Sequence, residues 1–187
     1  MIQKQARGAL LLDIVKAIKT HKELDWNKYL KPEDWQTINS IILPTKWYPF
    51  DLYHRSSIAV FQLVAGGNLE AAYTDGQRVG RRLFETTYKS LIRRKDPMVG
   101  LTQFVATYST MFNFSLMSME EVGPCRARVY HDYNAKDKGN IIFCQHLRGI
   151  FEVLIQMTGG KKGRVMIGAK QWEGALATRF DITWEEL

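Results

Sequence analysis

The sequence predicts an α+β fold in which a layer of helices packs on an antiparallel sheet. Apolar residues recur at helical spacing through most of residues 8–113 and again over 141–158. Short segments of alternating apolar and polar residues come in adjacent pairs, one pair on each side of the 141–158 segment. Adjacent strands pair antiparallel, whereas a regular alternation of strands and helices would predict a parallel sheet.

Each element has its own local signals. Pro32 followed by two acidic residues is typical of a helix start, and Pro44 and Pro97 each end a helical pattern. Glycine pairs after residues 64 and 158 are typical of helix ends. The expected helices span residues 8–20, 32–43, 51–64, 68–95, 101–113 and 141–158, and the expected strands span 114–120, 126–133, 163–168 and 175–184.

Length and composition favour one domain with its own core. The chain has 187 residues, of which 45% are hydrophobic and 24% are charged. We expect a single domain over residues 1–187, with an N-terminal helical part (1–113) and a C-terminal strand–helix–hairpin part (114–187). Two cysteines make no disulfide framework, and neither a secretory signal nor a membrane span is expected, so we expect a cytoplasmic protein.

The helix expected over 68–95 has two different faces. Val79, Leu83 and Phe84 belong to an apolar side that predicts burial in the core. The opposite side carries a basic stripe, formed by Arg78, Arg81, Arg82, Lys89 and Arg93. A solvated helix face and a binding surface for an acidic protein, a nucleotide or nucleic acid both explain this stripe. The net charge of +7 permits such partners without identifying one.

Residues 97–119 contain no charged side chain. A helix without charge on any face is usually central in a fold or covered by a partner. We therefore expect the helix over 101–113 to supply part of a homodimer surface.

Aromatic residues form the main candidate for a ligand site. Phe84, Tyr108, Phe112 and Phe151 lie on apolar faces of their expected helices and should converge. Solid packing and an apolar ligand cavity both remain open as interpretations. The candidate ligand-binding residues are Trp47, Tyr48, Phe84, Tyr88, Phe104, Tyr108, Phe112 and Phe151.

No pattern in the sequence predicts catalysis or a metal site. A nucleophile elbow and a P-loop are both missing, and the glycine–lysine run at 159–163 follows a helix instead of opening one. Cys125, His131, Cys144 and His146 do not have the spacing of a zinc finger or ribbon. We expect no enzymatic activity, no cofactor and no bound metal.

The C-terminal third carries a resemblance to a known family. A helix closing on Gly159 is followed by a strand, a turn at Gly174, and then Phe180, Ile182 and Trp184 in alternation. This pattern resembles the closing part of vinyl-reductase-type domains, which are related to haem–nitric-oxide-binding-like and TRAPP-type ligand-binding folds. The resemblance implies a helical layer on an antiparallel sheet, frequent dimers and an apolar ligand cavity.

A narrower resemblance comes from the N-terminal half. The Trp47-Tyr48-Pro49 element before a helix, together with Gly76 and Gly80, resembles an uncharacterised paralogous family of myxobacteria and their relatives. Vinyl-reductase-type domains commonly have cysteines at the positions of Lys170 and Thr178, so thiol chemistry does not carry over.

The haem contacts of the related sensors do not carry over either. The Tyr-x-Ser-x-Arg motif that holds the haem propionates in true nitric-oxide sensors is missing, because Tyr88, Ser90 and Arg93 depart from it by one residue.

Together these observations predict a non-catalytic sensory or adaptor domain for signalling. It would bind a small, apolar ligand, a partner protein or both, as a homodimer. Binding of nucleic acid or a nucleotide through the basic helix 78–95 is the alternative.

Overall fold

The computed structural model describes residues 3–114, 117–133 and 138–186, and the chain forms two compact units. Unit 1 contains the described residues up to Asn68 together with Thr110–Phe114, and unit 2 contains the rest. Residues 69–108 belong to unit 2, where the helix Leu69–Glu85 packs on the helix Lys138–Met157 and the helix Pro97–Tyr108 packs on the sheet. Among the described residues, no helix combines the length and apolarity needed to cross a membrane.

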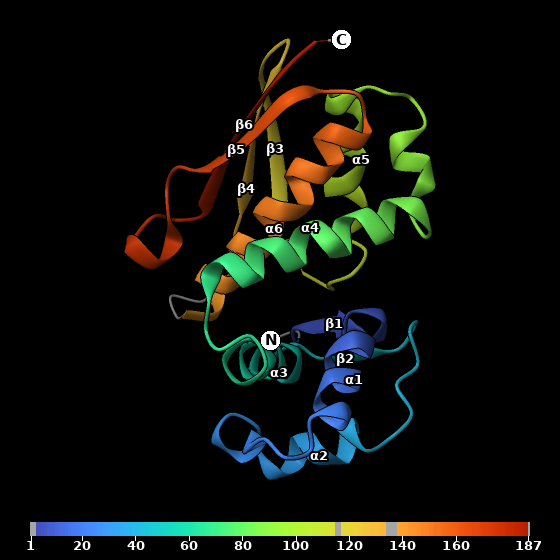
Figure 1. The fold of residues 1–187 in the computed structure, drawn as a ribbon, viewed down its shortest axis with the longest axis vertical. Helices are drawn as coiled ribbons and strands as arrows, with labels where there is room; N and C mark the ends of the chain where they lie inside the picture. Colours follow the sequence, from blue (N-terminus) through green and yellow to red (C-terminus); the bar gives the residue numbers. More distant parts are fainter. Residues whose placement is uncertain (1–2, 115–116, 134–137, 187) are drawn as a thin grey trace. The chain divides into compact units, whose positions relative to one another are not determined.

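Unit 1 is built from three helices and a small two-stranded sheet (Figure 1). The strands β1 (Gln5–Arg7) and β2 (Trp47–Pro49) pair antiparallel. The helices are α1 (Leu12–Thr20), α2 (Pro32–Ile38) and α3 (Phe50–Leu63), with short 3-10 turns at Gly8–Leu10 and Trp26–Lys28. Leu11, Ile18, Ile38 and Ala59 are fully or almost fully buried in its core.

A buried ion pair joins α2 to α3. Asp34 accepts a hydrogen bond from the backbone N–H of Lys31 at 2.9 Å and so caps α2. The guanidinium of Arg55 donates to both oxygens of the same carboxylate, at 2.7 and 3.0 Å. These bonds outweigh the opposing effect of burial and lower the pKa of Asp34.

Helix α2 is shorter than expected and ends at Ile38 instead of residue 43. The hydroxyl of Ser40 donates to the carbonyl of Thr37 at 2.8 Å, and the phenol of Tyr48 accepts from the N–H of Leu43 at 3.0 Å. These side-chain bonds compete with the helical ones. As a result Ile41, expected on an apolar helix face, is 85% exposed.

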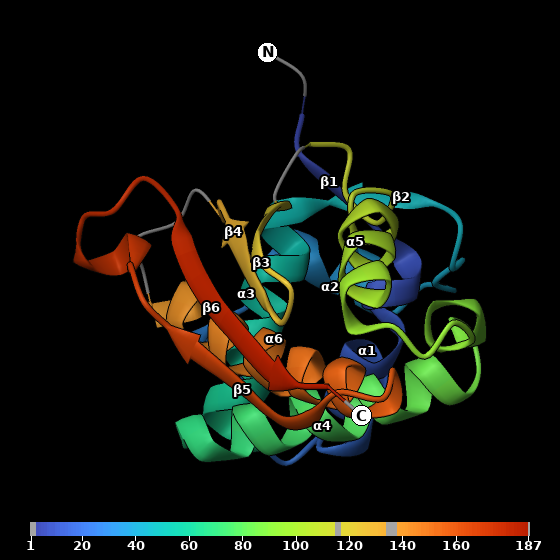
Figure 2. The same ribbon diagram turned by 90° about the horizontal axis from the view of Figure 1, so that it is seen from above.

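Unit 2 contains an antiparallel sheet with the strand order β3-β4-β6-β5, seen from above in Figure 2. The strands are β3 (Met117–Gly123), β4 (Arg126–His131), β5 (Lys161–Ile167) and β6 (Thr178–Glu185). Helix α6 (Lys138–Met157) packs on β5 and β6, and α5 (Pro97–Tyr108) packs on β3. This architecture confirms the predicted fold class of helices layered on an antiparallel sheet.

Two further helices also end earlier than expected. Helix α4 spans Leu69–Glu85 and is followed by a 3-10 turn at Lys89–Ile92, so it does not reach residue 95. Helix α5 ends at Tyr108 instead of residue 113, because the chain beyond it pairs with β1. The N–H of Arg7 donates to the carbonyl of Met111 at 2.8 Å, and Ala6 pairs with Phe112. The sequence pattern could not show this long-range pairing.

Helices α4 and α6 have the most extensive contact in unit 2, and they cross at glycines (Figure 1). A Cβ atom on Gly76 would collide with the carbonyl of His146, and one on Gly149 would collide with the carbonyl of Tyr73. The two backbones can approach this closely only because both residues lack a side chain.

Replacing Gly149 by alanine should therefore destabilise the protein. The added methyl group would meet backbone atoms of α4, which cannot move aside as a flexible side chain would, so we expect a loss of about 1–3 kcal/mol in urea unfolding. Gly123→Ala is the matched control, because a Cβ there meets nothing within 4 Å. Equal stability of the two variants would contradict the close crossing.

Candidate ligand site: a buried polar cluster

Polar side chains gather inside unit 2 where β4 ends, α6 begins and a 3-10 turn at Gln171–Glu173 leads to β6. None of them is more than 5% exposed. We call this group the buried polar cluster, and it consists of His131, Asn140, Cys144, Gln171 and Thr178.

Strand pairing and helix periodicity bring the cluster together. In the register of β4 and β6, His131 lies opposite Thr178. Alternation along β4 puts His131 on the same buried side as Ala127 and Val129. Asn140 and Cys144 are one turn apart on α6, and the thiol donates to the Asn140 amide oxygen at 3.2 Å.

Gln171 connects the cluster. Its amide oxygen accepts from Asn140 at 2.9 Å, and its amide nitrogen donates to a carboxylate oxygen of Asp132 at 2.7 Å and to the carbonyl of Leu176 at 2.9 Å. The backbone N–H of Gln171 donates to the Thr178 hydroxyl at 3.2 Å. The amide groups and the hydroxyl are therefore satisfied, as buried polar groups generally are.

His131 is the exception in this cluster. The side chain is 0% exposed, and neither ring nitrogen has a hydrogen-bond partner among the described residues. Burial lowers the pKa of His131 to about 3, although the neighbouring Asp132 opposes this shift. The ring is therefore neutral at physiological pH and offers one donor and one acceptor, each of which costs about 1–3 kcal/mol if left unpaired.

Aromatic rings surround this imidazole. Phe143 stacks on it with the ring centroids 5.3 Å apart, Tyr133 lies at 5.5 Å, and Tyr108 contacts it edge-on at 6.2 Å. We call these three residues the aromatic cage. The cage gives His131 apolar neighbours on several sides, so a hydrogen bond to either nitrogen would be made in a low-dielectric setting.

The thiol in the cluster is not poised for chemistry. Burial raises the pKa of Cys144 to about 12, so this side chain remains a protonated donor.

His146, the other histidine of α6, lies beside Asp75, with the ring nitrogen 3.4 Å from the carboxylate. No group of three or more histidine, cysteine or acidic residues suited to a metal occurs in the part of the chain that the structure describes.

The aromatic residues predicted to line a cavity are distributed over both units. In unit 2, Phe104 contacts Phe84, Tyr108 and Phe151, with ring centroids between 5.6 and 6.1 Å apart. Phe112 belongs to unit 1 and packs against Phe50 at 6.0 Å. Of the predicted residues, only Tyr108 also borders the buried polar cluster.

The remaining predicted ligand residues lie elsewhere. Trp47 and Tyr48 are in β2 of unit 1, and the Arg7 guanidinium lies 3.8 Å from the centre of the Trp47 ring. Tyr88 is half-buried just before the 3-10 turn that follows α4, and burial raises its pKa. Whether these residues bind a ligand stays a prediction.

The basic stripe on α4 and the following turn is exposed along its length. Arg78 pairs with Asp75 at 2.5 Å, and Arg81 donates to Gln156 at 3.4 Å. Arg82, Lys89 and Arg93 are also exposed. A partner for this stripe stays a prediction.

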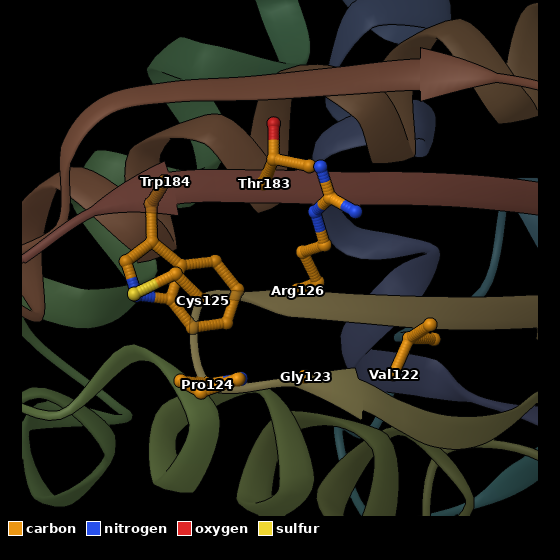
Figure 3. Close-up of a pocket in the computed structure, with 7 residues that line it drawn as sticks. All are labelled: Val122, Gly123, Pro124, Cys125, Arg126, Thr183 and Trp184. Atoms are coloured by element: carbon orange, nitrogen blue, oxygen red, sulfur yellow. The ribbon is translucent and has the colours of Figure 1, made fainter.

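Two surface hollows lie apart from the buried polar cluster. One, of about 440 Å³, is in unit 1 beside α1 and residues 40–42. The other, of about 620 Å³, is in unit 2 at the turn between β3 and β4, beside Thr183 and Trp184 (Figure 3). Neither hollow is lined by a histidine.

Sequence reasoning missed most of the cluster. The one usable signal was the alternation in β4, where the inward-facing Ala127 and Val129 are followed two residues later by His131. Gln171 and Thr178 reach Asn140 only through sheet register and a turn, and no spacing in the sequence shows either.

Comparison with known proteins places the fold among haem–nitric oxide/oxygen binding (H-NOX) domains. An H-NOX protein from K. algicida is similar over 97% of both chains, with a TM-score of 0.65 and 10% identity. An H-NOX protein from S. oneidensis in the Fe(II)NO state is similar over 96% of this chain and 99% of that one, with a TM-score of 0.61 and 12% identity. No protein-family model and no curated protein matches the sequence.

The K. algicida and S. oneidensis structures are described by their Fe(II) states, which raises the question whether a haem fits here. A haem needs an iron ligand that opens onto space for a macrocycle. The ring of His131 is enclosed by three aromatic rings, and neither surface hollow contains a histidine. The enclosed ring of His131 therefore does not fit a haem ligand, and no role is assigned to iron.

The buried imidazole should make the protein sensitive to acid. The unfolded chain binds a proton at His131 near pH 6.5, whereas the folded chain does so only near pH 3. The contribution of His131 to the free energy of unfolding should therefore be constant above about pH 6.5. Below that pH the free energy of unfolding should fall by about 1.4 kcal/mol per pH unit. Urea unfolding between pH 7 and 4.5 tests this.

The His131→Phe variant is the matched comparison, because it removes only this titration. Between pH 7 and 4.5 it should lose less stability than the unmodified protein. If the free energy of unfolding changed with pH in the same way in both proteins, a buried neutral imidazole would be contradicted. The bonds from His146 and Arg78 outweigh burial and lower the pKa of Asp75 to about 2, so its contribution to stability is constant between pH 7 and 4.5 and is lost only below about pH 3.8.

Proposed function

We propose that this protein is a non-catalytic ligand-sensing domain in which His131 hydrogen-bonds to a small, mostly apolar ligand. The observation that carries the proposal is an imidazole whose two nitrogens have no hydrogen-bond partner among the described residues, next to buried groups that are satisfied by one another. In the ligand-free protein, burying the unpaired donor and acceptor of this ring costs free energy. A ligand that hydrogen-bonds to the ring removes that cost.

The surroundings of His131 define the chemistry of the ligand. The aromatic cage favours an apolar body, and the neutral ring favours one hydroxyl, carbonyl or amide-like group over a charge. An anion is disfavoured further by the neighbouring Asp132. Catalysis is not part of the proposal, since the polar groups here are amides, a protonated thiol and a neutral imidazole.

Helix α6 offers a route from the ligand to a partner. It carries Asn140 and Cys144 in the cluster, and Gly149 at the crossing with α4. The outer side of α4 carries the basic stripe. A ligand that shifts α6 would therefore move the stripe, which suits a sensor that signals to an acidic protein. The homodimer belongs to the same proposal and is tested by light scattering.

The alternative function is binding of nucleic acid or a nucleotide through the basic stripe. It is favoured by the exposure of all five cations, Arg78, Arg81, Arg82, Lys89 and Arg93. Such binding would weaken steeply with salt. It would be lost on charge reversal at Arg81 and Arg82, as measured by retention on heparin.

Native mass spectrometry of the purified protein tests the proposal directly. We expect a co-purified small molecule that is lost in the His131→Phe variant. After unfolding and refolding to remove the ligand, this variant should be at least as stable as the unmodified protein, because it removes an unsatisfied polar group. Thr178→Val is the control, and it should lose about 1–3 kcal/mol by leaving the Gln171 N–H unpaired.

Two results would reject the proposal. One is a refolded His131→Phe variant that loses as much stability as Thr178→Val, which would mean that the protein itself satisfies the ring. The other is a protein that binds nothing at His131 except an ordered water molecule.

A further inference from the structure

The sheet of unit 2 has one side packed on helices and one side open. Val129, Val165, Phe180 and Ile182 are buried on the packed side. The residues that alternate with them face the other way and are exposed or half-buried. We call this second side the open face.

Two arginines flank a threonine on the open face. In the strand register, Arg126 of β4 and Arg164 of β5 both lie directly opposite Thr183 of β6. Neighbouring strands are about 4.8 Å apart, so the two arginine backbones are about 10 Å apart. Both long side chains can therefore reach an oxyanion held above the Thr183 hydroxyl.

The acidic residues of the open face are already paired with other cations. Asp181 lies 3.3 Å from the Arg128 guanidinium and 3.0 Å from that of Arg179. The Lys162 ammonium lies 3.1 Å from Glu185. These carboxylates are therefore not available to neutralise further arginines.

Arg126 and Arg164 are the two remaining arginines of the open face. Both are exposed, and within the described residues neither forms an ion pair or a side-chain hydrogen bond. Two guanidinium groups on either side of one hydroxyl repel each other, and an anion between them would relieve that repulsion. Guanidinium groups bind phosphate and carboxylate oxygens in two-pronged geometry.

A hollow of about 620 Å³ adjoins these residues (Figure 3). Arg126 and Thr183 form part of its lining, and the rest includes Val122, Pro124 and Trp184. The figure shows the Arg126 side chain extending toward Thr183, with the Trp184 ring on the other side of the hollow. Beside the hollow, the Cys125 thiol donates to the carboxylate of Glu186 at 3.7 Å. The volume is within the range of small-molecule sites.

We propose that this face binds a phosphate-bearing small molecule of nucleotide size. The phosphate would lie between Arg126 and Arg164 over the Thr183 hydroxyl, and the remainder of the molecule would lie in the hollow beside Val122 and Pro124. The site shares no residue with the buried polar cluster, so this proposal does not depend on the ligand at His131.

Calorimetric titration of the full chain with adenosine 5′-monophosphate tests this inference, with adenosine and inorganic phosphate as comparison ligands. The monophosphate should bind more tightly than either, since only it fills both parts of the site. Arg126→Gln and Arg164→Gln should each weaken its binding about tenfold, as expected for the loss of a charge-assisted hydrogen bond. Both arginines are exposed, so circular dichroism should show unchanged folding.

Lys22→Gln is the matched control, because it removes the same charge from an exposed position of unit 1 that belongs neither to the basic stripe nor to the open face. It should bind the monophosphate like the unmodified protein. Equal losses in Lys22→Gln and Arg126→Gln would overturn the inference, because they would show an effect of net charge alone. Unchanged affinity in both Arg126→Gln and Arg164→Gln, or no binding of the monophosphate, would also overturn it.

Discussion

The constraint on which this structure depends is that a buried polar group must find a partner. At the junction of β4, α6 and the turn before β6, Asn140, Gln171 and Thr178 meet this constraint with one another. Their bonds hold the start of α6 against the end of the sheet. His131 occupies the same junction without a partner among the described residues, and that imbalance is the basis of the proposed function.

The sequence predicted the fold well where local pattern decides structure. The strand pairs, helix α6, the start of α2 at Pro32 and the helix ends near the glycine pairs follow from periodicity and turn chemistry. The errors occurred where distant residues decide. Helix α2 ends early because the Tyr48 hydroxyl accepts a hydrogen bond from the N–H of Leu43. Helix α5 ends early because Met111 pairs with β1. The candidate site was mostly missed for the same reason, since it is assembled by sheet register.

The likeness to H-NOX structures is a likeness of fold. The arrangement of helices and strands is shared over nearly the whole chain at 10–12% identity. At this distance the fold does not determine what is bound, and the site has to be argued from its own residues. Here those residues are a neutral imidazole and aromatic rings packed against it.

The central claim is tested most directly by nitrogen-15 NMR of the His131 ring, recorded at pH 6 on the protein as purified and again after unfolding and refolding without ligand. The account predicts a neutral ring in both samples and a change in the shift of one ring nitrogen when the ligand is removed. A positively charged ring at pH 6, or identical ring spectra in the two samples, would contradict it.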